Sequence, residues 1–297
     1  MEFIEDSVSQ LAESPFWHPE QQALYWCDIK GRAIRRYREG FPVQHWPVPS
    51  EPGCAAPVRG GGLVIAMRDG TYLFDEQTGG ADKVLDCPYD PALYRFNDGR
   101  CDGAGRLLAG SLNEQKTAAD AELYSIVRSA SGWRQSRLAN GVMTANGLAF
   151  SPDKRVAYWA DTAAHRVDCF DYDLAGGELS NRRCFIQFEV KPADGSLRGY
   201  GGRPDGAAVD EAGCYWLAMY EGASILCVLP DGSIAQRYPV PVQCPTMVCF
   251  GGADRRTLFV TSARAGRPAA ELGEQPGAGG VFSMRVTTPG LPVDYFY

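Results

Sequence analysis

The sequence predicts an all-β fold, a six-bladed β-propeller with a central channel, and three observations lead to it. A short phrase recurs at intervals of roughly 40 to 60 residues, which is the period of a blade array. The phrase consists of a polar residue, a short apolar run, a tight turn and an aromatic or aliphatic strand. Short strand-like segments dominate the chain, and none has a sustained helical period. We therefore predict one propeller domain over residues 1–297.

The copies of the phrase define the predicted blades. One clear copy is Glu13-Ser-Pro-Phe-Trp-His-Pro-Glu, which is followed by Leu24-Tyr-Trp. A second is Asn146-Gly-Leu-Ala-Phe-Ser-Pro-Asp, which is followed by Ala157-Tyr-Trp. The remaining copies begin at Asn97, Asp205, Thr246 and, in a degenerate form, near Gly53.

Ten segments are rich in β-branched, aliphatic or aromatic residues and predict strands. Turn motifs such as Ser-Pro-Asp-Lys, Arg-Asp-Gly and Pro-Asp-Gly separate them. Three stretches, 113–121, 189–202 and 265–280, lack a strand pattern. Loops of this length are usually functional, so we expect them to cover one mouth of the propeller. The predicted strands are 24–29, 63–67, 71–74, 107–109, 122–127, 156–160, 167–172, 214–218, 224–229 and 257–261.

Composition excludes several classes of protein. The chain is 45% hydrophobic and 22% charged, as in soluble globular proteins. It has no run of about 20 apolar residues, and its N-terminus is acidic, so we expect no membrane association and a cytoplasmic location. A net charge of −7 without a basic run argues against nucleic-acid binding. The ten cysteines form no C-x-x-C pair and lie mostly in apolar runs, which favours buried thiols over disulfides. We expect a monomer or a small homo-oligomer.

The repeat places six residues at one equivalent position. In a propeller the first strand of each blade lines the channel, so these positions should form a ring. Two carboxylates and two amides in that ring are hard oxygen ligands, which suit Ca²⁺, Mg²⁺ or Mn²⁺. Two buried carboxylates without a cation would repel each other and raise a pKa. The ring members are Glu13, Gly53 or a neighbour, Asn97, Asn146, Asp205 and Thr246.

Simpler structural roles compete with this interpretation. Polar residues at the start of a blade also satisfy backbone groups around a wet channel, but five at one register favour a functional ring. Arg95 precedes the ring position and either holds substrate oxygens or pairs on the surface with Asp98 or Asp102. Asp28 and Asp161 each end a second strand, where a structural turn role is favoured. No Gly-x-Ser-x-Gly elbow or phosphate-binding glycine loop occurs.

Nearly the whole chain resembles the regucalcin/gluconolactonase family, also called the senescence-marker-protein family. The resemblance implies a six-bladed propeller that binds one divalent cation and hydrolyses sugar lactones. The order and spacing of several short motifs carry it. These motifs are Leu11-Ala-Glu13-Ser-Pro, Arg95-Phe-Asn97-Asp98-Gly, Asn146-Gly-Leu-Ala-Phe-Ser-Pro-Asp, Phe170-Asp-Tyr-Asp, Ser180-Asn-Arg-Arg, Pro204-Asp205-Gly, Cys249-Phe-Gly-Gly, Thr261-Ser-Ala-Arg and Gly279-Gly-Val-Phe.

The resemblance also implies roles for individual residues. The metal ligands correspond to Glu13, Asn146 and Asp205, and Arg95 and Asn97 correspond to the residues that hold the sugar. We expect Ca²⁺ as the cation, with Zn²⁺, Mn²⁺, Mg²⁺ or Fe²⁺ as alternatives. Asp205 is our candidate for the catalytic general base. The expected partner is a pentono- or hexonolactone.

Two positions depart from the family pattern. The family has an acidic substrate contact after the inner strands of the third blade, and Gln115 rather than Glu114 aligns with it. Both residues are candidates for substrate binding. Ala12 stands where the family usually has glycine, which should not affect the metal. Two other functions remain open: a non-catalytic calcium-binding regulatory propeller, and a hydrolase of another ester or an organophosphate.

Overall fold

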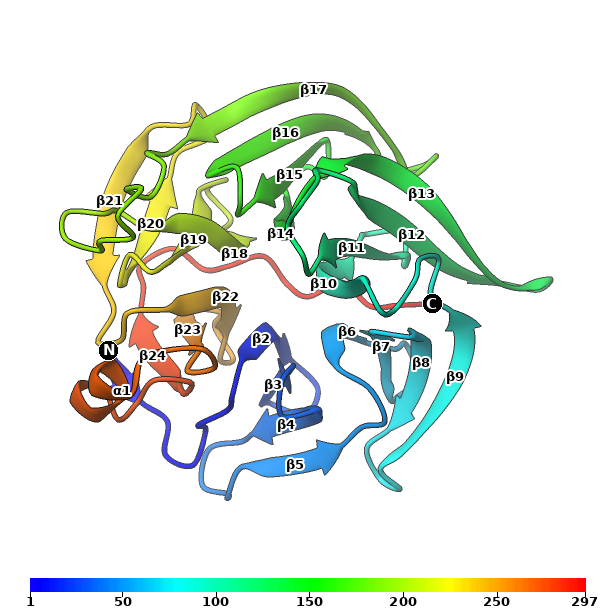
Figure 1. Ribbon diagram of the computed structural model, residues 1–297. Coiled ribbons are helices and arrows are strands. Elements are labelled where there is room, and N and C mark those ends of the chain that lie inside the picture. The colour runs from blue at the N-terminus through cyan, green and yellow to red at the C-terminus, as the bar shows by residue number, and fades with distance from the viewer.

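A computed structural model describes residues 1–297 and shows six four-stranded antiparallel sheets arranged around a central axis (Figure 1). The predicted six-bladed propeller is confirmed. The strands and the single helix are β1 (Glu2–Phe3), β2 (Ala12–His18), β3 (Ala23–Asp28), β4 (Ala33–Tyr37), β5 (Gln44–Pro47), β6 (Pro52–Pro57), β7 (Leu63–Met67), β8 (Gly70–Asp75), β9 (Gly80–Asp86), β10 (Tyr94–Cys101), β11 (Leu107–Asn113), β12 (Ala121–Ser129), β13 (Gly132–Val142), β14 (Ala145–Phe150), β15 (Val156–Asp161), β16 (Arg166–Asp173), β17 (Glu178–Gln187), β18 (Arg203–Val209), β19 (Tyr215–Tyr220), β20 (Ser224–Val228), β21 (Ile234–Pro239), β22 (Pro245–Gly251), β23 (Thr257–Ser262), α1 (Ala269–Glu274) and β24 (Val281–Arg285).

Five blades are continuous meanders, and the sixth combines both ends of the chain. Its strand order is β1-β24-β23-β22, so the N-terminal strand is added to the outer edge of the last blade. Glu2 pairs with Ser283, and Phe3 pairs with Phe282. This pairing closes the ring of blades, so that both faces of every sheet pack against neighbouring blades and not against solvent.

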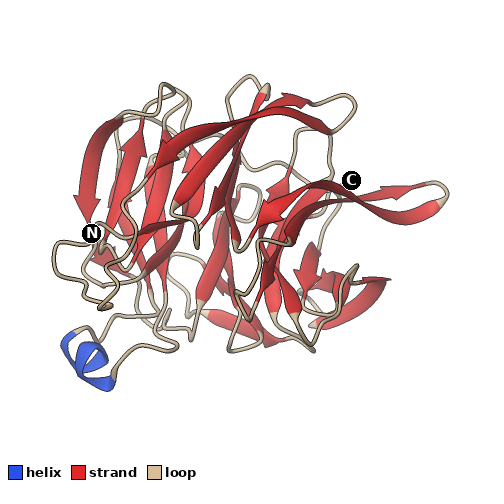
Figure 2. Ribbon diagram, turned by 45° about the horizontal axis from the view of Figure 1, so that its top comes forward, coloured by secondary structure: helices blue, strands red, loops and turns tan.

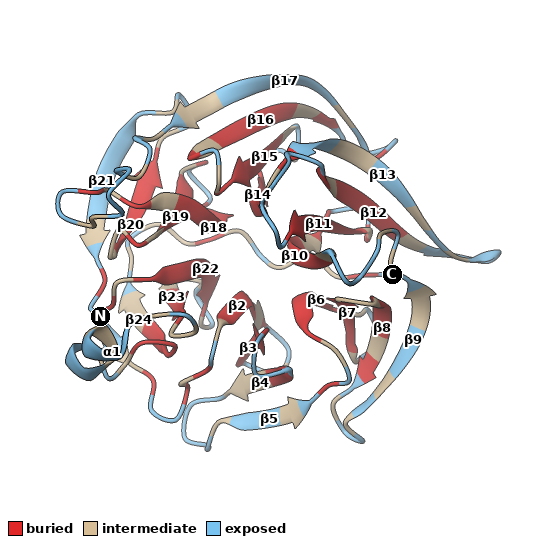
Figure 3. Ribbon diagram, viewed as in Figure 1, coloured by how far each residue is buried: buried red, intermediate tan, exposed pale blue.

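The core lies between neighbouring blades. Strands such as β3 and β7 are buried along their whole length, and the outermost strands β9, β17 and β21 are mostly exposed (Figure 3). One apolar cluster joins Phe16 and Tyr25 of the first blade to Ile65 and Phe74 of the second. The middle strands are buried on both faces, and for this reason they read as nearly continuous apolar runs.

Burial also explains which elements the sequence did not reveal. All ten predicted strands are present, and β11 extends from the predicted 107–109 to Asn113. The outer strands β5, β9, β13, β17 and β21 were not predicted, because their exposed residues carry no apolar pattern. The stretch 265–280 was predicted to be irregular and in fact contains the short helix α1, which lies at the rim (Figure 2). No helix here has the length and hydropathy of a membrane span.

Every innermost strand has a register shift near the position of the predicted ring. In the first blade the shift lies between Glu13 and Phe16, and in the fourth it lies between Asn146 and Ala149. The other four inner strands, β6, β10, β18 and β22, have their shifts at the corresponding place. A β-bulge bends the strand and redirects side chains. The bulges therefore mark where each inner strand changes direction at the axis.

The C-terminal segment after β24 crosses the middle of the propeller (red in Figure 1). Phe296 is fully buried, stacks on Trp133 at 5.3 Å, and its backbone N–H donates to the Pro57 carbonyl at 2.9 Å. The Lys154 Nζ lies 2.6 Å from the Asp294 Oδ2. The segment therefore connects the sixth blade to the second, third and fourth.

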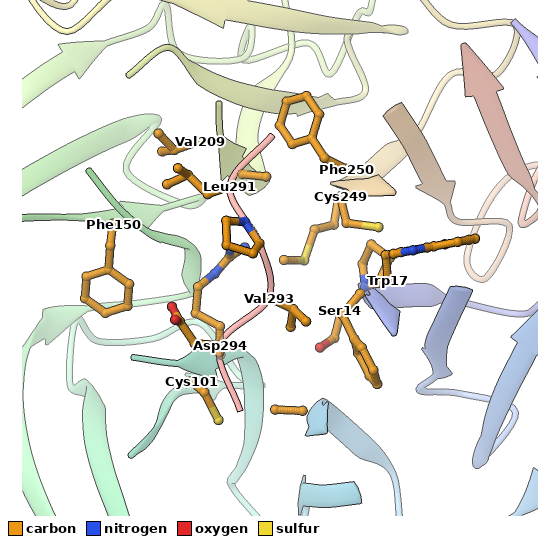
Figure 4. Close-up of a pocket in the computed structure, with 18 of the residues that line it drawn as sticks. Ser14, Trp17, Cys101, Phe150, Val209, Cys249, Phe250, Leu291, Val293 and Asp294 are labelled. Carbon is orange, nitrogen blue, oxygen red and sulfur yellow. The ribbon is translucent and has the colours of Figure 1, made fainter. Parts of the chain in front are cut away.

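Between this segment and the inner strands lies a mostly apolar cavity of about 80 Å³ (Figure 4). Its lining includes Phe150 and Val209, which end β14 and β18, Phe250 near the end of β22, and Leu291 and Val293 of the C-terminal segment. This end of the channel is where the inner strands finish, so the mouth at which they begin lies at the opposite end.

The C-terminal segment should contribute strongly to stability. Replacement of the buried Phe296 by alanine should lower the free energy of unfolding by about 3–5 kcal/mol, because it leaves a cavity between blades. Urea denaturation measures the loss. The matched control is Phe41→Ala, because Phe41 is 55% exposed and its loss should change stability by less than about 0.5 kcal/mol. Equal losses in the two variants would contradict the assigned role.

Candidate functional site

The beginnings of the inner strands surround a cavity of about 460 Å³. This volume lies in the range of small-molecule sites. Four of the six predicted ring residues line it, and they come from the first, third, fourth and fifth blades. They are Glu13, Asn97, Asn146 and Asp205.

The other two ring positions have structural roles. The Thr246 Oγ1 donates to the Ala12 carbonyl at 2.5 Å and lies 2.9 Å from the Thr261 hydroxyl, so it joins the sixth blade to the first. A Cβ at Gly53 would collide with the Phe96 carbonyl, so the second blade approaches the third too closely for any other residue. Neither residue lines the cavity.

Glu13 and Asp205 are both buried, and the protein gives them little compensation. The Glu13 Oε2 accepts one hydrogen bond, from the Ser14 N–H at 3.1 Å, and the Asp205 carboxylate accepts none. Burial, followed by the charge of Asp98, raises the pKa of Glu13 to about 8. Burial, followed by the charge of Glu13, raises the pKa of Asp205 well above its ordinary value. The charges of Arg203 and Lys116 at Asp205, and of Arg95 at Glu13, lower these pKa values but do not offset burial, so the pair remains short of positive charge and of hydrogen-bond donors.

A hard divalent cation fits this donor set. Glu13, Asp205 and the Asn146 amide line the same cavity, and all three offer oxygen ligands. No group of three His, Cys, Asp or Glu side chains is placed so that it could hold a metal ion, so a cation here would depend on two carboxylates and one amide oxygen. Three protein ligands leave positions for water or a substrate.

A chain of hydrogen bonds orients the amides at the centre of the site. The Asn97 Nδ2 donates to the Asn146 Oδ1 and to the Ala145 carbonyl, both at 2.8 Å. The Asn146 Nδ2 donates to the Thr162 Oγ1 at 2.7 Å. The Asn146 oxygen is therefore fixed on the side opposite Thr162.

Arg95 is buried, so the surface-pairing alternative is wrong. One guanidinium nitrogen donates to the Asn97 Oδ1 at 2.7 Å and to the Phe96 carbonyl at 3.0 Å. Asp98 instead accepts the Leu148 N–H at 2.8 Å. The Arg95 Nε has no hydrogen-bond partner in the protein, which leaves a buried donor at the cavity.

Glu114 and Gln115 do not line the cavity. Glu114 lies in an ion cluster, with its carboxylate 2.8 Å from Arg68, 3.6 Å from Lys30 and 3.7 Å from the Arg95 Nε. The backbone N–H of Gln115 donates to the Asn113 Oδ1 at 3.0 Å. Substrate contact by Glu114 or Gln115 therefore remains a prediction.

Several cavity residues were missed by the sequence reasoning, among them Lys116, Thr144 and Arg203. Lys116 follows Gln115 in the same loop, and no motif marks it. Arg203 and Thr144 stand two residues before Asp205 and Asn146, as Arg95 stands two before Asn97. Thus a second register of the repeat, two residues before the first, also faces the cavity, and the same periodicity would have revealed it.

Asp28 and Asp161 have the structural roles that were favoured for them. The Asp28 carboxylate accepts the backbone N–H groups of Gln10, Leu11 and Gly31. The Asp161 carboxylate accepts those of Met143, Thr144 and Ala163. Each aspartate therefore fixes the connection that leads into an inner strand and aligns the ring residue after it.

Comparisons with known proteins agree with the fold and the repeat. Regucalcin from Agrobacterium tumefaciens, a solved structure described as a calcium-binding protein, has a TM-score of 0.89 at 24% identity and covers 99% of this chain and 96% of its own. A luciferin-regenerating enzyme has a TM-score of 0.87 at 23% identity, with 99% and 98% coverage. At these identities the two structures support the fold alone.

Two relatives found by sequence have a higher sequence identity to this chain than the two solved structures have. A 6-deoxy-6-sulfogluconolactonase from Pseudomonas putida is 39% identical over 290 residues, which is 97% of this chain and 95% of that protein. Regucalcin from Danio rerio is 33% identical over 288 residues, with 96% and 93% coverage. The profile of the SMP-30/gluconolactonase/LRE-like region matches residues 11–264. This chain therefore belongs to the SMP-30/gluconolactonase/LRE-like family.

Proposed function

We propose that the protein is a lactonase that hydrolyses a five- or six-carbon aldonolactone to the aldonic acid with one divalent cation. The observation that carries the proposal is the pair of buried carboxylates, Glu13 and Asp205, which share a polar cavity with the Asn146 amide and whose pKa values stay raised because nearby positive charges do not offset burial. Membership of a family with sugar lactonases among its named relatives supports the reaction class.

Glu13, Asn146 and Asp205 would hold the cation. When bound, it would supply Lewis-acid polarisation of the lactone carbonyl and electrostatic stabilisation of the developing oxyanion. Ca²⁺ is our first choice because carboxylate and amide oxygens suit hard cations, with Zn²⁺, Mn²⁺, Mg²⁺ and Fe²⁺ as alternatives.

Asp205 would act as the general base. Its carboxylate receives no hydrogen bond from the protein, so an oxygen is free to take a proton from the attacking water. The water oxygen bonds to the lactone carbonyl carbon, and the ring C–O bond then breaks. The departing alkoxide takes the proton back from Asp205, which leaves the open-chain acid.

Arg95 and Asn97 would position the sugar. Arg95 is held by its bonds to Asn97 and to the Phe96 carbonyl, so its guanidinium does not have to be ordered when the substrate binds. Glu114, which approaches the Arg95 Nε, would either contact a sugar hydroxyl or orient Arg95. Gln115 is a further candidate for a hydroxyl contact.

Replacement of Asp205 by asparagine should lower kcat for gluconolactone by on the order of 10²–10⁴, because the general base is lost. The same substitution should weaken cation binding. Acid release at constant pH, corrected for spontaneous hydrolysis, measures the rate. Asp171→Asn is the matched control, because Asp171 pairs with Arg183 on the surface of β16. Full activity in Asp205→Asn would refute the assignment.

Cation binding should stabilise the fold. After EDTA treatment, addition of Ca²⁺ at 100 times its Kd should raise the free energy of unfolding by about 2.7 kcal/mol, because the cation binds only the folded state. Thermal unfolding measures the shift, and Glu13→Gln should reduce it. If none of the five cations shifts the unfolding temperature of the wild type, no cation site exists. A shift without lactone turnover would instead favour the calcium-binding regulatory alternative.

Without a cation, stability should fall as the pH rises from about 5 to about 8. Unfolded Glu13 loses its proton near 4.5, while in the folded protein its pKa is raised to about 8, so the folded state binds the extra proton in this window. Urea denaturation in EDTA at several pH values measures the slope. Glu13→Gln removes the titrating group and should flatten the slope, so identical slopes in the two proteins would contradict this origin.

A further inference from the structure

Three successive blades present an unpartnered donor at the same register. Arg95, Thr144 and Arg203 each stand two residues before a ring residue, on β10, before β14 and on β18 respectively. The Arg95 Nε, the Thr144 Oγ1 and the Arg203 Nε are buried and have no hydrogen-bond partner in the protein. All three residues line the cavity. A buried donor without a partner is costly, so its repetition at one register points to a ligand that accepts hydrogen bonds.

Positive charge also gathers at this cavity. Lys116 lines the cavity and has no ion-pair partner, and burial together with the charges of Arg203 and Arg95 lowers the pKa of its ammonium group. Arg203 shares one carboxylate, Glu221, with two other cations: the Arg203 guanidinium lies 3.3 Å from it, and Lys191 and Arg267 each lie at 2.9 Å. The single negative charge of Glu221 is thus shared by three positively charged side chains.

The two other basic residues of the cavity, Lys30 and Arg95, already have carboxylate partners, and the Arg95 Nε lies 3.7 Å from Glu114. The Lys30 ammonium lies 2.8 Å from Glu51 and 3.6 Å from Glu114. The charges of Lys116 and Arg203 also act on Asp205, but a divalent cation held by Glu13 and Asp205 would neutralise that carboxylate and leave the excess positive charge at Lys116 and Arg203, in a protein whose net charge is −7. A neutral sugar lactone does not need this charge.

We propose that Lys116, Thr144 and Arg203 form a subsite for a tetrahedral oxyanion, either a sulfonate or a phosphate, carried by the lactone at the end remote from its carbonyl. The inference rests on the proposed lactonase function and specifies its substrate class. A three-oxygen anion accepts hydrogen bonds from several donors at once, and a charged acceptor strengthens each of them. The carbonyl would lie at Glu13 and Asp205, and the anion would lie toward Lys116 at the mouth.

The name of the Pseudomonas putida relative denotes a lactone with a sulfonate at its sixth carbon. That substrate belongs to the class that this subsite would accept. The assignment of Lys116, Thr144 and Arg203 stands on the geometry of this chain, and a phosphate-bearing lactone satisfies the same donors.

The test compares three lactones on the cation-loaded enzyme: gluconolactone, 6-phosphogluconolactone and 6-deoxy-6-sulfogluconolactone. The wild type should prefer at least one anionic lactone by about tenfold or more in kcat/KM. Lys116→Met should abolish most of this preference through KM, because the remote anion contributes binding that is uniform along the reaction. Lys116→Arg should restore it. The phosphate and sulfonate arms identify which anion is preferred.

Two further variants distinguish loss of the subsite from a general effect of removing a positive charge from the protein. Thr144→Val removes only the unpartnered hydroxyl, so it should reduce the preference about tenfold without loss of stability. Lys83→Met removes the same charge from the exposed strand β9 and should leave the preference unchanged. Equal kcat/KM for neutral and anionic lactones in the wild type, or an unchanged preference in Lys116→Met, would overturn the subsite while the lactonase function stands.

A binding measurement decides the case in which no lactone is hydrolysed. Calorimetry should show that the wild type binds glucose 6-phosphate and not glucose, and that Lys116→Met weakens this binding about tenfold or more. Binding that is unchanged in Lys116→Met would place the phosphate on the cation and refute the subsite. Binding that is lost in Lys116→Met would support the subsite even if the lactonase proposal fails.

Discussion

The mutual repulsion of Glu13 and Asp205 is the constraint on which the rest of the site depends. The two carboxylates come from blades far apart in the sequence, and both are buried. The protein donates a single hydrogen bond to the pair, from the Ser14 N–H to Glu13. Such a pair is tolerated in one of two ways: a carboxylate keeps its proton, or a cation binds. Because the pKa of Glu13 is raised to about 8, the first state prevails up to neutral pH when no cation is bound, and the second allows a charged, reactive site near neutrality.

The scaffold holds these groups in place by means that do not themselves touch the cavity. Asp28 and Asp161 fix the backbone before two inner strands, and Thr246 ties the sixth blade to the first. Because these hydrogen bonds hold the backbone next to the ring residues, the scaffold itself orients them. Preorganisation of this kind reduces the cost of orienting a substrate.

The repeat explains why much of the site was predictable from the sequence. One register identified Glu13, Asn97, Asn146 and Asp205, and the same reasoning with a shift of two residues would have found Thr144 and Arg203. Lys116 was not predictable, because it stands in a loop outside the repeat. Phe296 was missed for a similar reason, and the outer strands were missed because exposed strands carry no apolar pattern. Sequence periodicity thus identifies residues that face the propeller axis or the core. It says little about residues in loops, in the C-terminal segment or on exposed outer strands.

The pairing of β1 with β24 has a consequence for synthesis of the protein on the ribosome. Glu2 and Phe3 leave the ribosome long before their partners exist, because Ser283 and Phe282 are added about 280 positions later. At the usual speed of translation this interval is roughly 15 to 60 s. During that time the first five blades are able to form, but the ring stays open and an edge of the sixth is missing. The nascent chain therefore depends on its last strand to become a closed propeller, and any interruption of translation before β24 leaves exposed apolar blade faces that chaperones would recognise.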